Sequence, residues 1–179
     1  MNFQEILKPT ARNIKKEWRT LGIDKIGASK HEYGIALKSH LQTINNQTVI
    51  LSALLTPSIN RQKNVNMIVD ITLPKSGDLE SCLGALSAFM QQTTALLNPI
   101  TLLVDMRTSQ IILRQCQIMP IAHPPATTAF INAIQLLVPL LQPIINTLCQ
   151  TNPSQDDARE LANQFVNSFQ GALKNESTL

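Results

Sequence analysis

The sequence is poor in charged and aromatic side chains. Of its 179 residues, 15% are charged and 4% are aromatic, whereas about a quarter of a globular chain is usually charged. The surface must therefore be covered by uncharged Gln, Asn, Ser and Thr, or be hidden in part by a partner. Glycine and proline are too few for a low-complexity or collagen-like chain, and a hydrophobic share of 44% excludes intrinsic disorder. What remains is a compact chain, long enough to bury a core.

The sequence also lacks the motifs of common enzymes and metal sites. It contains no G-x-S-x-G, no P-loop and no Rossmann glycine fingerprint. Cys82, Cys116 and Cys149 lie more than thirty residues apart, without a C-x-x-C pair. Their odd number, in a chain without a predicted signal peptide, predicts reduced thiols. We therefore expect no catalytic residue, no cofactor and no bound metal.

Two kinds of chemistry stay open as less favoured alternatives. Asp70 and Asp105 fall on predicted strands and could face a shared pocket, but neither has a base or metal partner in the pattern. Solvent-facing polar positions are the more favoured interpretation. His31, His40 and His123 fall in a turn, on a strand and in a proline-rich loop. They would form a zinc site only if the fold brought them together.

The formal net charge of +3 comes from the N-terminal part of the chain. Phosphate binding usually needs converging cations together with aromatic or base-reading side chains, and only Trp18 and Tyr33 lie nearby. We therefore expect a solvated helix face and no nucleic-acid partner. Residues 1–22 are charged and amphipathic, without the apolar stretch of a secretory signal, which predicts a cytoplasmic protein. The cations concerned are Lys8, Arg12, Lys15, Lys16, Arg19, Lys25, Lys30 and Lys38.

Hydrophobic periodicity predicts an α+β chain with the order α-βββ-α-ββ-α and an extra C-terminal helix. The short connections between the first three strands favour an antiparallel meander, and a four-residue connector favours a later hairpin. We expect the antiparallel sheet to pack on the helices. The predicted helices are 3–21, 79–97, 128–149 and 156–173, and the predicted strands are 33–41, 48–55, 65–73, 100–105 and 110–119.

Two of these helices carry almost no charge. Residues 79–97 are apolar on more than one side, which predicts a buried helix. Residues 128–149 contain Pro139 and Pro143, which predict a kinked or split helix because each proline forfeits a backbone hydrogen bond. That segment is long enough to cross a membrane, but amide side chains interrupt it and no aromatic belt follows. We expect no membrane partner.

In element order, residues 3–149 resemble the type III secretion chaperone-like fold of bacterial secretion chaperones and adaptors. The likeness is carried by residues 21–24 after the first helix, by residues 96–98 at the end of the second, and by the hairpin LLVDMRTSQIILRQC before the long helix. It implies one chaperone-like domain at residues 1–150 and a bacterial, cytoplasmic protein. Residues 151–179 would be a linker and an accessory C-terminal helix. The chain departs from those chaperones in being basic and longer.

A five-stranded sheet and one amphipathic helix cannot cover both uncharged helices, so part of their surface should meet another chain. The sequence thus predicts a non-catalytic protein-binding module that dimerises, with itself or a different chain, and holds a client segment, possibly of a secreted effector. Two alternatives are a small-ligand or enzymatic domain, with its pocket between the sheet and residues 79–97, and a subunit of a larger assembly. The candidate partner-binding residues are Leu86, Phe89, Met90, Phe130, Ile134, Leu137 and Leu141.

Overall fold

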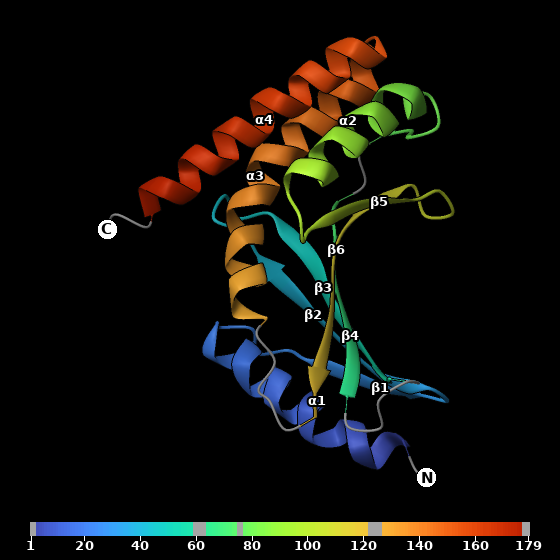
Figure 1. The fold of residues 1–179 in the computed structure, drawn as a ribbon, viewed down its shortest axis with the longest axis vertical. Helices are drawn as coiled ribbons and strands as arrows, with labels where there is room; N and C mark the ends of the chain where they lie inside the picture. The colour runs from blue at the N-terminus through green and yellow to red at the C-terminus, as the bar shows by residue number, and fades with distance from the viewer. Residues whose placement is uncertain (1–2, 59–63, 75–76, 122–126, 177–179) are drawn as a thin grey trace.

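Helices lie on one side of an antiparallel sheet in the computed structural model, which describes residues 3–58, 64–74, 77–121 and 127–176 (Figure 1). This arrangement confirms the predicted α+β class. Most predicted elements lie within two residues of their observed bounds. The elements are α1 (Phe3–Thr20), β1 (Gly27–His31), β2 (Gly34–Gln42), β3 (Thr48–Pro57), β4 (Asn64–Thr72), α2 (Leu83–Leu96), β5 (Thr101–Asp105), β6 (Gln110–Pro120), α3 (Thr128–Thr151) and α4 (Gln155–Glu176).

The six strands are ordered β1-β2-β3-β4-β6-β5, and every neighbouring pair is antiparallel. The first four strands follow one another in a meander. The chain then passes through α2 and returns as the predicted hairpin, in which β6 joins β4 and β5 becomes the last strand. The sheet therefore ends in two edges, β1 on one side and β5 on the other.

The prediction of five strands is wrong by one, because β1 was missed. All five residues of β1 are exposed, so the segment shows no alternation between apolar and polar side chains. Its pairing with β2 across the turn at residues 32–33 defines it instead. Gly34 begins β2, and a Cβ atom there would lie 2.2 Å from the backbone oxygen of Leu55. The close approach of β2 to β3 thus needs glycine at this position.

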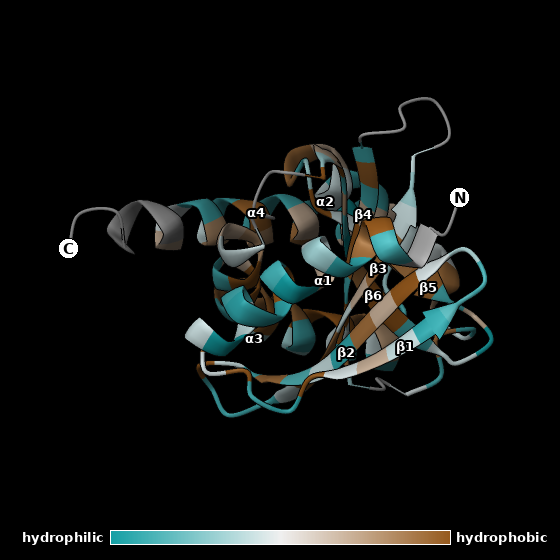
Figure 2. Cartoon of the chain, turned by 90° about the horizontal axis from the view of Figure 1, so that it is seen from below, coloured by the Kyte–Doolittle hydropathy of each residue, from teal (hydrophilic) through white to brown (hydrophobic). Residues whose placement is uncertain are grey.

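Alternation along the strands places the core on the side of the helices. In β4, Val65, Met67, Val69 and Ile71 are buried, whereas the residues between them are partly exposed. The same holds for β2 and β3, so one face of the sheet packs on the helices and the other is open. Figure 2, in which the chain is seen from below, shows the helices gathered on one side of the strands.

Hydrogen bonds join the end of α1 to the start of α3. Trp18 is fully buried and its Nε1 donates a hydrogen bond to Thr127 Oγ1 at 3.2 Å. Beside it, Glu17 Oε1 accepts from the backbone N–H of Thr128 at 2.7 Å. A carboxylate stabilises a helix N-terminus because the unpaired N–H groups there carry partial positive charge. Two segments more than a hundred residues apart are joined in this way.

The α3 helix runs without a break past Pro139 and Pro143, so the predicted split does not occur. Its apolar residues recur every three or four positions and are buried along the whole helix, which compensates for the missing backbone hydrogen bonds. In length and composition α3 could cross a membrane. Its buried face, however, is the pattern expected of a core helix.

The α4 helix packs on α2 and α3. Its start agrees with the prediction from the acidic first turn, since the helix begins at Gln155 with Asp156 and Asp157. Phe165 lies against Phe89 of α2, with ring centroids 5.9 Å apart. The buried residues of α4 belong to the same hydrophobic cluster as those of the sheet. Beyond its contacts with α2 and α3, α4 extends away from the other elements (Figure 1).

Candidate partner-binding groove

The seven residues predicted to bind a partner lie in the core of the folded chain. Each is at most 9% exposed and contacts the chain's own helices and sheet. Burial is more complete than predicted because α4 packs on both α2 and α3. Of the seven, Met90 also lines an open groove, so the surface open to a partner is made mainly by other residues. The seven buried residues are Leu86, Phe89, Met90, Phe130, Ile134, Leu137 and Leu141.

An open groove with a volume of about 320 Å³ lies between α2 and β5. The small-ligand or enzymatic alternative placed its pocket here, between the sheet and residues 79–97. At the groove, Leu83 is 44% exposed and Met106 is 39% exposed, and none of the described residues that line it carries a charge. The lining residues are Leu83, Ser87, Met90 and Gln91 of the helix and Leu102, Leu103, Val104 and Met106 of the strand and its end.

A second hollow, of about 330 Å³, lies on the other side of the same helix, between α2 and the start of α4. Leu83, Ser87 and Gln91 line both hollows, so a single uncharged face of α2 separates them. Gln155 and Arg159 of α4 complete the second hollow. Arg159 is the charged residue among the described residues that line this hollow.

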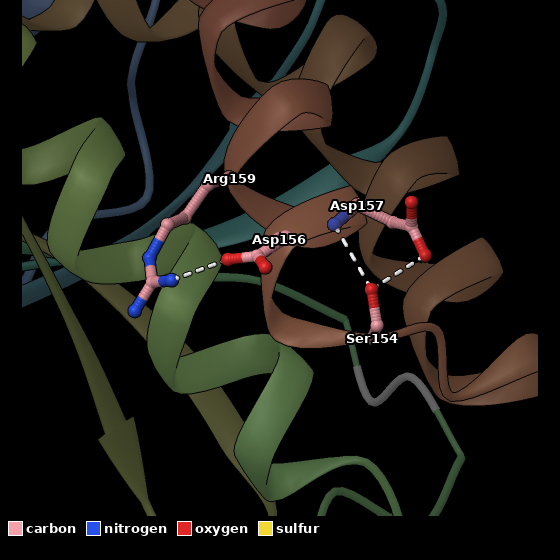
Figure 3. A network of polar contacts seen from close by, with 4 residues as sticks. All are labelled: Ser154, Asp156, Asp157 and Arg159. Carbon is pink, nitrogen blue, oxygen red and sulfur yellow. Dashed lines mark hydrogen bonds and ion pairs between the residues drawn. The ribbon is translucent and has the colours of Figure 1, made fainter.

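Hydrogen bonds fix the start of α4 beside this hollow (Figure 3). Ser154 Oγ accepts from the backbone N–H of Asp157 at 3.2 Å and donates to the carboxylate of Asp157 at 2.6 Å. This reciprocal pattern caps a helix N-terminus. Arg159 Nη1 donates to Asp156 Oδ1 at 2.7 Å. The wall of the second hollow is therefore held by local contacts within α4.

The backbone of β5 faces the groove. On one side β5 pairs with β6, and on the other side no strand adjoins it within the part of the chain that the structure describes. The N–H of Leu102 donates to Thr94 Oγ1 of α2 at 3.2 Å, so this residue points its backbone away from β6. In an antiparallel strand alternate residues point the same way. Val104 therefore presents its backbone N–H and carbonyl on the groove side.

The structure does not bring together the two carboxylates that the sequence singled out. Asp70 accepts two hydrogen bonds of 2.8 Å from Arg114 on the neighbouring strand, which raises the pKa of Arg114. Asp105 lies at the end of β5 and accepts from the backbone N–H of Arg107 at 3.0 Å. Arg114 is in register with Thr101, four residues from Asp105, which corresponds to about 13 Å along a strand. The alternative in which Asp70 and Asp105 share a catalytic pocket is therefore wrong.

The three histidines considered for a zinc site lie in different parts of the chain. His31 lies on β1 and His40 on β2, whereas His123 lies outside the described residues. Within the ranges that the structure describes, no group of three or more His, Cys, Asp or Glu side chains could hold a metal ion.

Two cysteines far apart in the sequence lie side by side. The Sγ atoms of Cys82 and Cys149 are 3.0 Å apart, and all three cysteines are free thiols. Linear spacing could not reveal this contact, because it is made by the packing of α2 on α3. Cys116, on β6, is exposed and lies apart from that pair.

No protein-family model matches the chain, and no curated protein matches its sequence. What the chain does is therefore inferred from the groove and from the two edges of the sheet. Sequence reasoning missed the groove residues on β5. The available signal was that Leu102, Leu103 and Val104 form a continuous apolar run, in a strand too short to show alternation.

Proposed function

We propose that the chain is a non-catalytic protein-binding module that holds an extended client segment along β5. Its role would be that of a bacterial secretion chaperone or adaptor in the cytoplasm. The observation that carries the proposal is the position of an unpaired strand edge beside an uncharged apolar groove. A client strand would pair its backbone with Val104 and direct alternate side chains toward α2. Covering these apolar anchors would keep the client unfolded without any nucleotide.

The lining of the groove favours a peptide over a small molecule. Sites for small ligands usually combine an enclosed apolar cavity with several convergent polar or charged groups. Here the groove is open, its volume of about 320 Å³ is at the small end of such sites, and only Ser87 and Gln91 offer polar side chains. A peptide backbone supplies its own hydrogen bonds along β5, so it needs few polar side chains from the groove.

The open face of the sheet supports the second part of the proposal, that two copies pair. Leu54 and Ile118 are exposed on the face that no helix covers, and Ile118 is 70% exposed. Register places Leu54 beside Ile68, and Asn66 beside Ile118, so these side chains are close neighbours. Contiguous exposed apolar area of this kind is typical of protein interfaces. The resemblance to secretion chaperones, which is a likeness in element order, agrees with both parts.

The client site is tested by adding a charge to the groove. Leu83→Glu and Met106→Glu change exposed side chains, so both variants should fold as the wild type does. A client identified by cross-linking in the native host should bind each variant at least about tenfold more weakly, because a carboxylate would be buried against apolar side chains. Ile44→Glu, at a 65% exposed position outside the groove, is the matched control and should bind normally.

Hydrogen exchange shows where the client lies. Binding should protect the amide of Val104, which faces the groove, and leave those of Gly27–His31 unchanged, since only β5 would gain a strand. Equal binding by Leu83→Glu and the wild type would contradict the proposal. A stoichiometric small molecule seen by native mass spectrometry, and lost in the Leu83→Glu variant, would favour the small-ligand alternative.

Pairing of two copies has its own test. Light scattering over a range of concentrations should show a dimer for the wild type and a monomer for Ile118→Lys, with Ile44→Lys as the matched control. A wild-type chain that stays monomeric at high concentration would refute pairing while leaving the client site standing.

A further inference from the structure

The thiols of Cys82 and Cys149 are in contact. Cys82 is the fully buried residue that immediately precedes α2, and Cys149 lies in the last turn of α3. Their Sγ atoms are 3.0 Å apart, although 67 positions separate them in the sequence. A shift of about 1 Å would bring the two sulfur atoms to bonding distance. The third thiol, Cys116, is exposed on β6 and is not part of this pair.

We propose that Cys82 and Cys149 are a thiol modification site, which a small disulfide such as glutathione disulfide converts to a reversible intramolecular disulfide. The bond would join the start of α2 to the end of α3. This inference does not depend on the proposed function, because it concerns the helices and not the client. It adds to the sequence prediction of three reduced thiols, which holds as long as no oxidant is present.

A hollow beside Cys149 gives the oxidant a point of entry. A hollow of about 180 Å³ is lined by Asp78, Ser81, Asn146 and Cys149, among others, and does not include Cys82. Cys82 is fully buried, whereas Cys149 is partly exposed. A small disulfide that enters this hollow therefore meets Cys149 first. Cys82, behind it, is placed to complete the reaction.

The exchange balances in two steps. The Cys149 thiol loses its proton to water, and its sulfur attacks one sulfur of glutathione disulfide. The S–S bond of the oxidant breaks, a mixed disulfide forms on Cys149, and one glutathione leaves as a thiol after taking up a proton. Cys82 then loses its proton and attacks the Cys149 sulfur, which releases the second glutathione. The protein loses two electrons and two protons, and the oxidant gains them.

The surroundings of Cys149 set the pace of this reaction. Burial, with the hydrogen bond to Cys82 as a second cause, raises the pKa of the Cys149 thiol to about 12. Only the thiolate attacks a disulfide, so little of the reactive form is present at neutral pH. We therefore expect uncatalysed exchange over minutes to hours. The disulfide should therefore form when oxidising conditions last for minutes to hours, and not during a shorter change.

The disulfide would stiffen the elements around α2. It would close a loop that contains α2, β5, β6 and the greater part of α3. Cross-links over long loops stabilise proteins mainly by restricting the unfolded chain. Leu83, which lines both hollows beside α2, directly follows Cys82. The oxidised form should therefore be more heat-stable, with the start of α2 held in place.

The test uses the full chain with Cys116→Ser, which removes the third thiol and leaves only the pair. The protein is equilibrated in buffers of increasing glutathione disulfide, quenched in acid, and measured by intact mass and peptide mapping. We expect a mass loss of about 2 Da, a linked peptide pair containing Cys82 and Cys149, and a rise in Tm of about 5–15 °C. Half-oxidation should occur in a buffer at least about tenfold more reducing than for the same chain in urea.

The single variants Cys82→Ser and Cys149→Ser, made in the same background, are the controls. Neither should lose mass, and Cys82→Ser should instead keep a stable glutathione adduct on Cys149. Three results would overturn the inference: a glutathione adduct as the end product in the chain with both thiols, equal half-oxidation in native buffer and in urea, or a lower Tm after the link has formed.

Discussion

The two edges of the sheet differ in what protects them. β1, with the sequence GASKH, has every side chain exposed and carries Lys30 and His31. β5, with the sequence TLLVD, has apolar side chains and is flanked by α2 and the groove. An edge strand exposes unpaired backbone groups, and charged side chains discourage other strands from adding to it.

This difference shows how one sheet can keep one edge closed and the other open. At β1 the charged side chains of the strand itself discourage pairing. At β5 the cover is a neighbouring helix, which satisfies one backbone group through Thr94 and leaves Val104 facing the groove. The edge that we propose for a partner is thus the one whose protection comes from a separate element. The tests that follow compare the two edges and the region between them.

The largest effect is expected from ending the chain at Thr151. Phe165 and Phe169 are buried in the wild type, and each such side chain contributes about 1.5–3 kcal/mol. Truncation should therefore lower the free energy of unfolding by several kcal/mol and raise dye binding, while the strand signal in circular dichroism stays. Because α4 supports α2, hydrogen exchange should rise at β5 and not at β1. Complete unfolding would show that residues 151–179 belong to the main domain and are not accessory.

The next largest effect concerns the β1 side. Gly34→Ala would push a Cβ atom to 2.2 Å from the Leu55 backbone oxygen, which should cost about 3 kcal/mol of stability. Gly27→Ala is the matched control in the same pair of strands, since its Cβ would lie 3.6 Å from the nearest atom and should change stability by about 0.5 kcal/mol or less. Urea denaturation measures both. Equal losses would mean that the approach of β2 to β3 is not the constraint.

Between the two edges, the ion pair of Asp70 and Arg114 should have a moderate effect. Both side chains are partly buried and make two hydrogen bonds of 2.8 Å. Arg114→Ala should therefore lower stability by about 1 kcal/mol, and the loss should shrink in high salt. Arg107→Ala, beside the β5 edge, removes an exposed contact of 3.9 Å and should change nothing measurable. A loss for Arg107→Ala equal to that for Arg114→Ala would reverse this ranking.

The smallest change in stability is expected at β1 itself, where the double variant Lys30→Val with His31→Val removes the charge. Both positions are exposed, so the free energy of unfolding should shift by no more than about 0.5 kcal/mol. Self-association should nevertheless increase, because an apolar unpaired edge accepts another strand. Sedimentation measures it, with Lys16→Val on α1 as the control. If the double variant associates no more than the wild type, charge is not what closes this edge.

Much of the fold was predictable because local patterns carry it. The alternation of Val65, Met67, Val69 and Ile71 predicts β4 and the face that it buries. Asp156 and Asp157 mark the start of α4, since acidic side chains favour a helix N-terminus. The two uncharged helices and the hairpin were predicted on the same grounds, as was the α+β class.

The rest depends on which elements meet, and that is decided by packing over long distances in the chain. Periodicity predicts that Leu86 and Leu137 are covered, but not that the chain's own sheet and helices cover them. No local pattern marks β1, whose residues are all exposed and which exists only because it pairs with β2. The groove beside Val104 and the contact of Cys82 with Cys149 arise the same way, from α2 lying against β5 and α3. Side-chain patterns determined the elements and their buried faces, whereas only the tertiary structure decided the edges, the groove and the thiol pair, because each is formed by residues distant in sequence.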